Sequence, residues 1–172
     1  SSWLVATLVL FAAMPGRGEG GRLVLVERGV SRAPIVVSPD APPMTRRAAD
    51  ELAGFMEKIS GAKPQVLAGA PATAPAHAIW VGDQPKLREL FPGLSFEFKH
   101  PEEILIAADE KHLGIAGRDV WDPRRPTAKG RHGRVIEGWQ DEYGTVNAVY
   151  TFLQDYLGVR WLWPGETGED VV

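Results

Sequence analysis

The sequence predicts an α+β fold, in which a mixed β-sheet of about seven strands is covered mainly on one face by two main helices and one short helix. Three observations lead to this prediction. Apolar residues recur at helical spacing within 45–60 and again within 145–157. Short runs rich in Val, Ile and Leu lie before, between and after these helices. Helices therefore separate groups of strands along the chain, an order typical of α+β domains.

The first half of the domain contains two predicted strands followed by the clearer of the two helices. The strands lie at 22–29 and 33–38, each bounded by Gly or Pro. The helix at 45–60 is predicted because apolar residues repeat at spacings of four, three and four, at Ala48, Leu52, Phe55 and Ile59. Gly61 follows at the position where a left-handed residue ends a helix.

The second half alternates short strands with helices in the same way. Two apolar runs, 102–109 and 112–119, are separated by only two residues and predict an antiparallel hairpin. The remaining predicted elements are strands at 63–69 and 77–83, a short helix at 85–91, a helix at 145–157 ended by Gly158, and a final strand at 159–163.

The predicted elements fit one domain with appendages. Residues 120–142 show no period and carry many charges, Pro and Gly, which predicts a long loop. We expect a signal-peptide-like segment with a Gly-rich junction at 1–21, an α+β domain at 22–163 and a linker at 164–172.

Composition narrows the classes of function. The chain has 172 residues, 44% hydrophobic and 24% charged residues, and a net charge of -3. This balance gives no global field that would attract nucleic acid, so we expect no nucleic-acid partner. The sequence holds no cysteine, which excludes disulfides, thiolate nucleophiles and zinc–thiolate sites.

An apolar run of eleven residues, "WLVATLVLFAA" at 3–13, precedes the domain. It is too short to span a bilayer but has the length of a signal-peptide core, and a buried strand or short helix is the alternative. An exported protein without cysteine is most simply placed in a bacterial periplasm or outside the cell. We therefore predict a secreted or periplasmic bacterial protein that has no membrane contact once the signal is removed.

Cofactor and metal motifs are weak. "GRGEGG" at 16–21 matches a dinucleotide-binding pattern in letters, but a strand follows it where a helix is needed. The four histidines, His77, His100, His112 and His132, have no metal-ligand spacing. The serine-hydrolase motif G-x-S-x-G does not occur. We expect no cofactor and no metal.

Acidic pairs are possible glycosidase catalysts, because glycoside hydrolysis uses two carboxyls about 5–10 Å apart. The available pairs are Glu102–Glu103, Asp141–Glu142 and Glu166 with Glu169. Neighbours on a strand point to opposite faces, and acids before a helix usually interact with its dipole. We assign no catalytic residue to this chain.

Cations and indole rings are the better candidates for ligand contact. A basic stretch, Arg118, Arg124, Arg125, Lys129, Arg131 and Arg134, would suit an acidic sugar or phosphate, or simply form a solvated loop face. Trp121 and Trp139 lie in the same region, and an indole ring stacks on the apolar face of a sugar or pins a loop to the core.

Four segments together resemble a known group of proteins: "ADELAGFMEKISGAKPQV" (49–66), "AIWVGD" (78–83), "LGIAGRD" (113–119) and "YGTVNAVYTFLQDYLGVRWLWPGETGE" (143–169). They look like the N-terminal domain of large bacterial glycosidase-like proteins. That group is similar to family 67 alpha-glucuronidases and, in this domain, to the non-catalytic second domain of family 20 beta-hexosaminidases. The resemblance covers roughly residues 22–169, and the segment that begins "YGTVNAVY" is the most specific.

The resemblance implies a non-catalytic α+β sandwich that leads into a (β/α)₈ barrel, which carries the catalytic acids. Trp161 and Trp163 would then face that barrel, and the parent would be an exported glycoside hydrolase in polysaccharide breakdown. If residues of this chain touch the glycan, we expect Arg118, Trp139, Trp161 and Trp163. Loop 120–142 departs from the family pattern, so Trp139 rests on chemistry alone. The alternatives are a free-standing carbohydrate-binding module and a structural interaction module.

Overall fold

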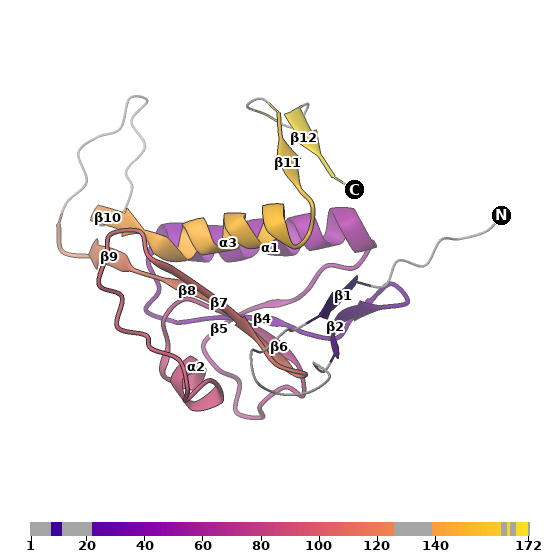
Figure 1. Ribbon diagram of the computed structural model, residues 1–172, viewed down its shortest axis with the longest axis horizontal. Coiled ribbons are helices and arrows are strands. Elements are labelled where there is room, and N and C mark those ends of the chain that lie inside the picture. The colour runs from indigo at the N-terminus through magenta and orange to yellow at the C-terminus, as the bar shows by residue number, and fades with distance from the viewer. Residues whose placement is uncertain (1–7, 12–21, 126–138, 163–164, 166–167, 172) are drawn as a thin grey trace.

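The computed structural model describes residues 8–11, 22–125, 139–162, 165 and 168–171 (Figure 1). At its centre is a mixed five-stranded sheet in the order β5-β4-β6-β8-β7. These strands are β4 (Ile35–Val37), β5 (Val66–Ala68), β6 (Ala78–Val81), β7 (Ile104–Ala108) and β8 (His112–Gly117). The first four in spatial order are parallel, and β7 runs antiparallel to β8 at the edge. The α+β class with a mixed sheet is confirmed.

Two long helices, α1 (Pro43–Ser60) and α3 (Gly144–Asp155), cover one face, and the short α2 (Pro85–Leu90) lies on the other (Figure 1). The strands alternate accordingly. In β4, Ile35 and Val37 join the core under α1 and α3, whereas Val36 joins a second core with Leu87 of α2. Helical cover is therefore heavier on one face, as predicted, but both faces are buried.

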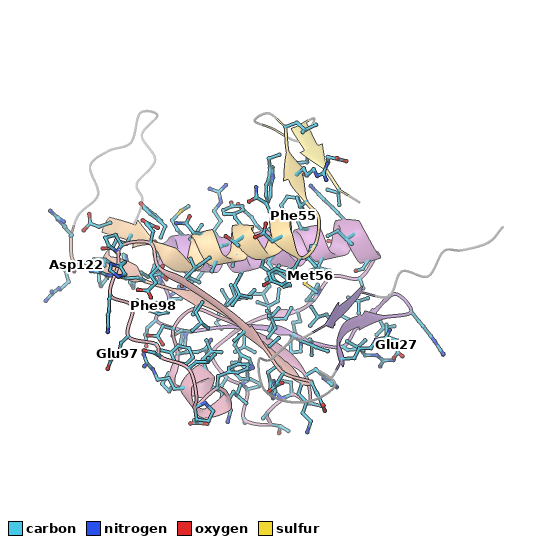
Figure 2. The ribbon with its side chains drawn as sticks, in the orientation of Figure 1. Glu27, Phe55, Met56, Glu97, Phe98 and Asp122 are labelled. Atoms are coloured by element: carbon cyan, nitrogen blue, oxygen red, sulfur yellow. The ribbon has the colours of Figure 1, made fainter. Side chains whose placement is uncertain are left out.

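The amphipathic pattern predicted at 45–60 is realised in α1. Leu52 and Met56 are fully buried against the sheet, and Figure 2 labels Met56 and its neighbour Phe55 on this helix. Gly61 ends α1 in the left-handed conformation, with φ of 75°, and its N–H donates to the Glu57 carbonyl at 2.8 Å.

The hairpin predicted at 102–119 is confirmed as the antiparallel pair β7–β8. Its turn is closed by Asp109, whose backbone N–H donates to the His112 carbonyl at 2.9 Å. The Asp109 carboxylate accepts the backbone N–H groups of Lys111 and His112 at 2.7 and 2.6 Å. A short side-chain acceptor thus satisfies the turn, as Asp commonly does.

A single sheet of seven strands is not observed among the described residues, because the other strands pair separately. They are β1 (Leu8–Phe11), β2 (Arg22–Glu27), β3 (Val30–Ser31), β9 (Asp119–Asp122), β10 (Trp139–Tyr143), β11 (Arg160–Trp161) and β12 (Glu169–Asp170). They form three small sheets, β1-β2-β3, β9-β10 and β11-β12. The strand predicted at 159–163 leaves the main sheet because Gly158, with φ of 72°, redirects the chain after α3.

Two other predictions change at their boundaries. The predicted loop 120–142 begins and ends in paired strands, β9 and β10, while residues 126–138 lie outside the described part of the chain.

Within the apolar segment 3–13, Leu8–Phe11 form β1 against β2, which is the strand alternative to a signal peptide. Export therefore remains a prediction. Within the described residues, no helix is long and apolar enough to cross a membrane.

Candidate functional site

Two concave regions occur at different places along α1. The first, which we call the edge cavity, has a volume of about 660 Å³ and lies where β4, β6 and β8 end. The second, the hairpin cleft, has a volume of about 760 Å³ and lies between α1, α3 and the β11–β12 hairpin. Both volumes are in the range of small-molecule sites.

The edge cavity borders a junction where two backbones touch. A Cβ atom added to Gly117 would lie 2.2 Å from the carbonyl carbon of Gly144, and one added to Gly144 would lie 2.3 Å from the backbone nitrogen of Arg118. The Gly144 N–H donates to the Arg118 carbonyl at 2.9 Å, and the Gly117 N–H donates to Thr145 Oγ1 at 3.1 Å. The "LGIAGRD" and "YGTVNAVY" segments therefore meet here, and both glycines are needed for close approach.

Asp119 joins the two long helices at this junction. Its Oδ1 accepts the Thr145 backbone N–H at 3.0 Å, and its Oδ2 accepts the Thr45 hydroxyl at 2.9 Å. The first bond caps the amino end of α3, and the second ties α1 to the same carboxylate. Burial raises the pKa of Asp119 above 3.8, and the bonds from Thr145 and Thr45 partly offset that rise.

A second carboxylate, that of Glu102 in the segment before β7, also accepts hydrogen bonds at the start of α3. Glu102 accepts the Tyr143 backbone N–H at 3.2 Å and the Asn147 side-chain amide at 2.5 Å. Its neighbour Glu103 accepts the backbone N–H groups of Lys99 and His100, which lower the pKa of Glu103. Asp141 and Glu142 precede α3 in the chain and lie in β10, and the carboxylates that accept backbone hydrogen bonds at the start of α3 come from the remote residues Glu102 and Asp119.

Arg118, a predicted sugar contact, lines the edge cavity but already has protein partners. Its Nε lies 3.1 Å from Glu142 Oε2, and its Nη1 donates to the Lys99 carbonyl at 3.2 Å. Glu142 Oε2 is buried and accepts no hydrogen bond among the described residues, so its contact with Arg118 is electrostatic. Arg118 therefore helps to hold β10 beside the cavity.

Three rings meet at the hairpin cleft. Trp161 makes edge contacts with Phe55 and Tyr150, each with ring centroids 5.5 Å apart. The Tyr150 hydroxyl donates to Glu51, which also pairs with Arg47 Nε at 2.8 Å. Burial, followed by the hydrogen bond to Glu51, raises the pKa of Tyr150 to about 12.

Charges and an exposed apolar residue complete the cleft. Lys58 of α1 forms an ion pair with Glu169 of β12, which joins the hairpin to the helix. Leu162, the next residue after Trp161, leaves 62% of its surface exposed. The cleft thus combines a ring cluster, paired charges and a bare apolar side chain.

The structure does not bring the predicted sugar contacts together. Arg118 lies at the edge cavity and Trp161 at the hairpin cleft. Trp139 begins β10 opposite Asp122, and the position of its side chain is outside the described features. Trp163 lies outside the described residues.

Several lining residues were not predicted. The sequence predicts only that Phe55 and Tyr150 lie in helices, and it predicts no role for Asp40 and Glu97. The signal that marks the edge cavity is the polar residues directly after three strands, "SPD", "GD" and "RD", because parallel strands end at one edge.

The basic stretch is only partly described. Arg124 pairs with Asp122 at 3.2 Å, and Arg125 lies 3.5 Å from Asp141. Lys129, Arg131 and Arg134 lie outside the described residues. Among the residues that the structure describes, no cluster of His, Asp and Glu could hold a metal ion.

Comparisons with known proteins add no family assignment. A scan against protein-family models finds no match to this chain, and a search of curated proteins also finds none.

Proposed function

We propose that this chain is the non-catalytic N-terminal domain of an exported glycoside hydrolase, and that it supports a (β/α)₈ catalytic barrel. The hairpin cleft is the observation that carries this proposal. After α3 the chain projects from the helical layer as β11, which pairs with β12 (Figure 1). Trp161 of β11 makes an edge contact with the ring of Phe55 on α1. It also presents Leu162, with 62% of its surface exposed, beside these rings.

The chemistry of this surface suits a large folded partner. An exposed Leu next to a partly buried Trp offers apolar area, and the Lys58–Glu169 pair lies at its rim. Interfaces of stable complexes have this arrangement of apolar centre and polar border. The resemblance to glycosidase N-terminal domains supplies the identity of the partner, a barrel that follows in the same parent chain.

Two steps test the proposal. Extending the reading frame beyond codon 172 should reveal about 250 residues with alternating strand and helix periodicity. In that parent protein, Leu162→Asp should convert one cooperative thermal transition into two, because a charge in the interface uncouples the domains. Val30→Asp is the matched control, since Val30 is exposed at 52% on the β2–β3 hairpin. A single unchanged transition in Leu162→Asp would exclude the hairpin cleft as the interface.

Export is the second part of the proposal. It depends on the apolar segment 3–13, of which Leu8–Phe11 pair with β2 in the structure. Expression of the parent in a bacterium, followed by mass spectrometry of its amino terminus, should show cleavage near 14–21 and recovery from the periplasm or medium. An intact amino terminus in the cytosolic fraction would exclude export and favour the strand.

A free-standing carbohydrate-binding module is the alternative. The ring cluster of Phe55, Tyr150 and Trp161 favours it, because sugars stack on such rings. A stop codon directly after Val172, together with glycan binding lost in Trp161→Ala, would replace the supporting role with this one.

A further inference from the structure

We propose that His112 is a pH-sensitive switch, which holds the core under α2 closed while its imidazole is neutral and loosens that core when it is protonated. The switch depends on one hydrogen bond, in which the indole Nε1–H of Trp80 donates to Nδ1 of His112 at 3.3 Å. Trp80 lies in β6, and His112 begins β8, which pairs with β6. The switch is independent of the proposed support of a barrel, because both residues belong to the sheet itself.

The indole N–H of Trp80 is a buried donor. Trp80 is 1% exposed, and an indole nitrogen can donate a hydrogen bond but cannot accept one. The ring lies in the second core, together with Leu87 of α2 and with Phe96. His112 provides the hydrogen-bond acceptor for this N–H within the described chain. Loss of that acceptor would leave a buried donor unpaired, which destabilises the packing around it.

The acceptor role fixes the protonation state of His112. A neutral imidazole carries one N–H and one free lone pair, so Nδ1 can accept only when the proton is on Nε2. In the imidazolium ion both nitrogens carry protons, and the Nδ1–H would then face the indole N–H of Trp80. The two rings meet edge on, with centroids 6.1 Å apart. Protonation therefore replaces a hydrogen bond by two opposed donors.

The surroundings of His112 also oppose a positive charge. Burial is the largest cause that lowers the pKa of His112 below 6.5. Asp109 raises the pKa in part, while His77, Lys111 and Lys86 lower it further. The Asp109 carboxylate already accepts the backbone N–H groups of Lys111 and His112. Its negative charge is therefore shared with the turn and only partly offsets the other effects.

A second histidine lies beside the first. His77 comes directly before β6, where Ala78 pairs in register with His112. Nδ1 of His77 is buried and has no hydrogen-bond partner among the described residues. A charge on His77 adds to the cost of a charge on His112. The amino ends of β6 and β8 thus bring two imidazoles together next to a buried indole.

Acid should loosen one face of the sheet first. Because the folded-state pKa of His112 is lowered, the unfolded chain binds this proton more tightly. The stability from His112 is therefore fully present above pH 6.5 and is lost as the pH falls through the folded pKa. The second core receives this loss, and its Phe96 also lines the edge cavity. The core under α1 and α3 lies on the other face (Figure 1).

The first test follows the Trp80 indole N–H of the whole chain by NMR, from about pH 8 to about pH 5. We expect its resonance to shift with the same midpoint as the His112 imidazole, below 6.5. Neutral His112 should carry its proton on Nε2. Hydrogen exchange, corrected for the intrinsic effect of pH on exchange rates, should show that protection falls in α2 and at Phe96 while α1 keeps its protection.

The second test uses His112→Asn, which keeps an acceptor and removes the titration, since the side-chain oxygen of Asn can take the place of Nδ1 and does not ionise. From about pH 7.5 to about pH 5, the thermal midpoint of the wild type should fall by about 2–4 °C more than that of this variant, the shift expected for one lost hydrogen bond. His100→Asn is the control, because His100 is exposed, and it should behave as the wild type does.

Any of four results would overturn the switch. They are a Trp80 resonance that stays fixed while His112 titrates, a proton on Nδ1 of neutral His112, an equal loss of protection in α1 and α2, and identical pH profiles of the wild type and His112→Asn. Trp80→Phe, which should raise the measured pKa of His112, replaces His112→Asn if that variant does not fold. The measurements on the wild type need no variant.

Discussion

The two ends of α1 are held by different forces. At the edge cavity, Gly117 and Gly144 bring two backbones into contact, and Asp119 bonds to both long helices. At the hairpin cleft, β11 and β12 are joined to α1 by ring contacts and by the exposed Lys58–Glu169 pair. The first arrangement is part of the fold itself, because no side-chain rearrangement can relieve a backbone overlap. The second is an attachment that can loosen while the sheet stays intact.

A large effect is expected at the backbone contact. Gly117→Ala places a methyl group 2.2 Å from the Gly144 carbonyl carbon, so β8 and α3 must separate. We expect a loss of about 3 kcal/mol or more in the free energy of unfolding, measured by urea denaturation. Gly54→Ala is the matched control, because nothing lies within 4 Å of its added Cβ atom. That change should be neutral or stabilising by about 0.5–1 kcal/mol. Equal effects of the two substitutions would contradict the close approach.

Asp119 tests the same junction through its charge. Asp119→Asn should lower the free energy of unfolding by about 1–2 kcal/mol, since it weakens the α3 cap and the bond to Thr45. Because burial raises the folded-state pKa, the folded protein holds this proton more tightly than the unfolded chain. The wild-type carboxyl therefore contributes more stability below pH 3.8 and loses it as the pH rises through the folded pKa.

The destabilisation caused by Asp119→Asn should depend on pH. The cost of Asp119→Asn should be larger near pH 3 than near pH 7, in denaturation series at both values. Asp122→Asn is a suitable control, because Asp122 is also in β9 but its side chain, within the described part of the chain, accepts hydrogen bonds only from Arg124. A cost for Asp119→Asn that grows with pH would show that hydrogen bonding, rather than burial, dominates its titration.

Two tryptophan substitutions compare the stability that the core contributes with the stability that the β11–β12 hairpin contributes. Trp80 is 1% exposed in the α2-side core, and Trp80→Ala should cost about 3–5 kcal/mol. Trp161 is only half-buried, so Trp161→Ala should cost about 1–2 kcal/mol in the same urea measurement. Near-UV circular dichroism should lose the Trp161 signal while far-UV spectra remain unchanged. A cost for Trp161→Ala that equals the cost for Trp80→Ala would mean that the hairpin is part of the core.

Much of the main layer could be predicted from the sequence, because period and composition report local structure directly. The α1 pattern from Ala48 to Ile59 and the hairpin around Asp109 are such cases. The pairing of β11 with β12 could not be predicted from residues 159–163. A short apolar run such as Trp161–Leu162 does not indicate which strand it pairs with or which surface it covers. Asp119 and Glu102 as remote caps of α3 were also out of reach, because a contact across 26 or 41 positions leaves no local pattern.

The smallest effect on the free energy of unfolding is expected for the hydrogen bond between the Tyr150 hydroxyl and Glu51 at the hairpin cleft. Tyr150→Phe should cost about 1 kcal/mol, because it removes only the bond to Glu51. The raised pKa gives a sharper measurement. The folded state holds the phenol proton more tightly than the unfolded chain, so this stability is present below pH 10 and is lost as the pH rises through about 12. Ultraviolet titration of the three tyrosines should show one ionising near 12, and Tyr150→Phe should remove that step. Tyr156→Phe, at an exposed ring stacked on Phe152, should leave it in place. If the late step survives in Tyr150→Phe, the ring of Tyr150 does not lie beside Glu51, and the hairpin end is looser than the contacts of Trp161 imply.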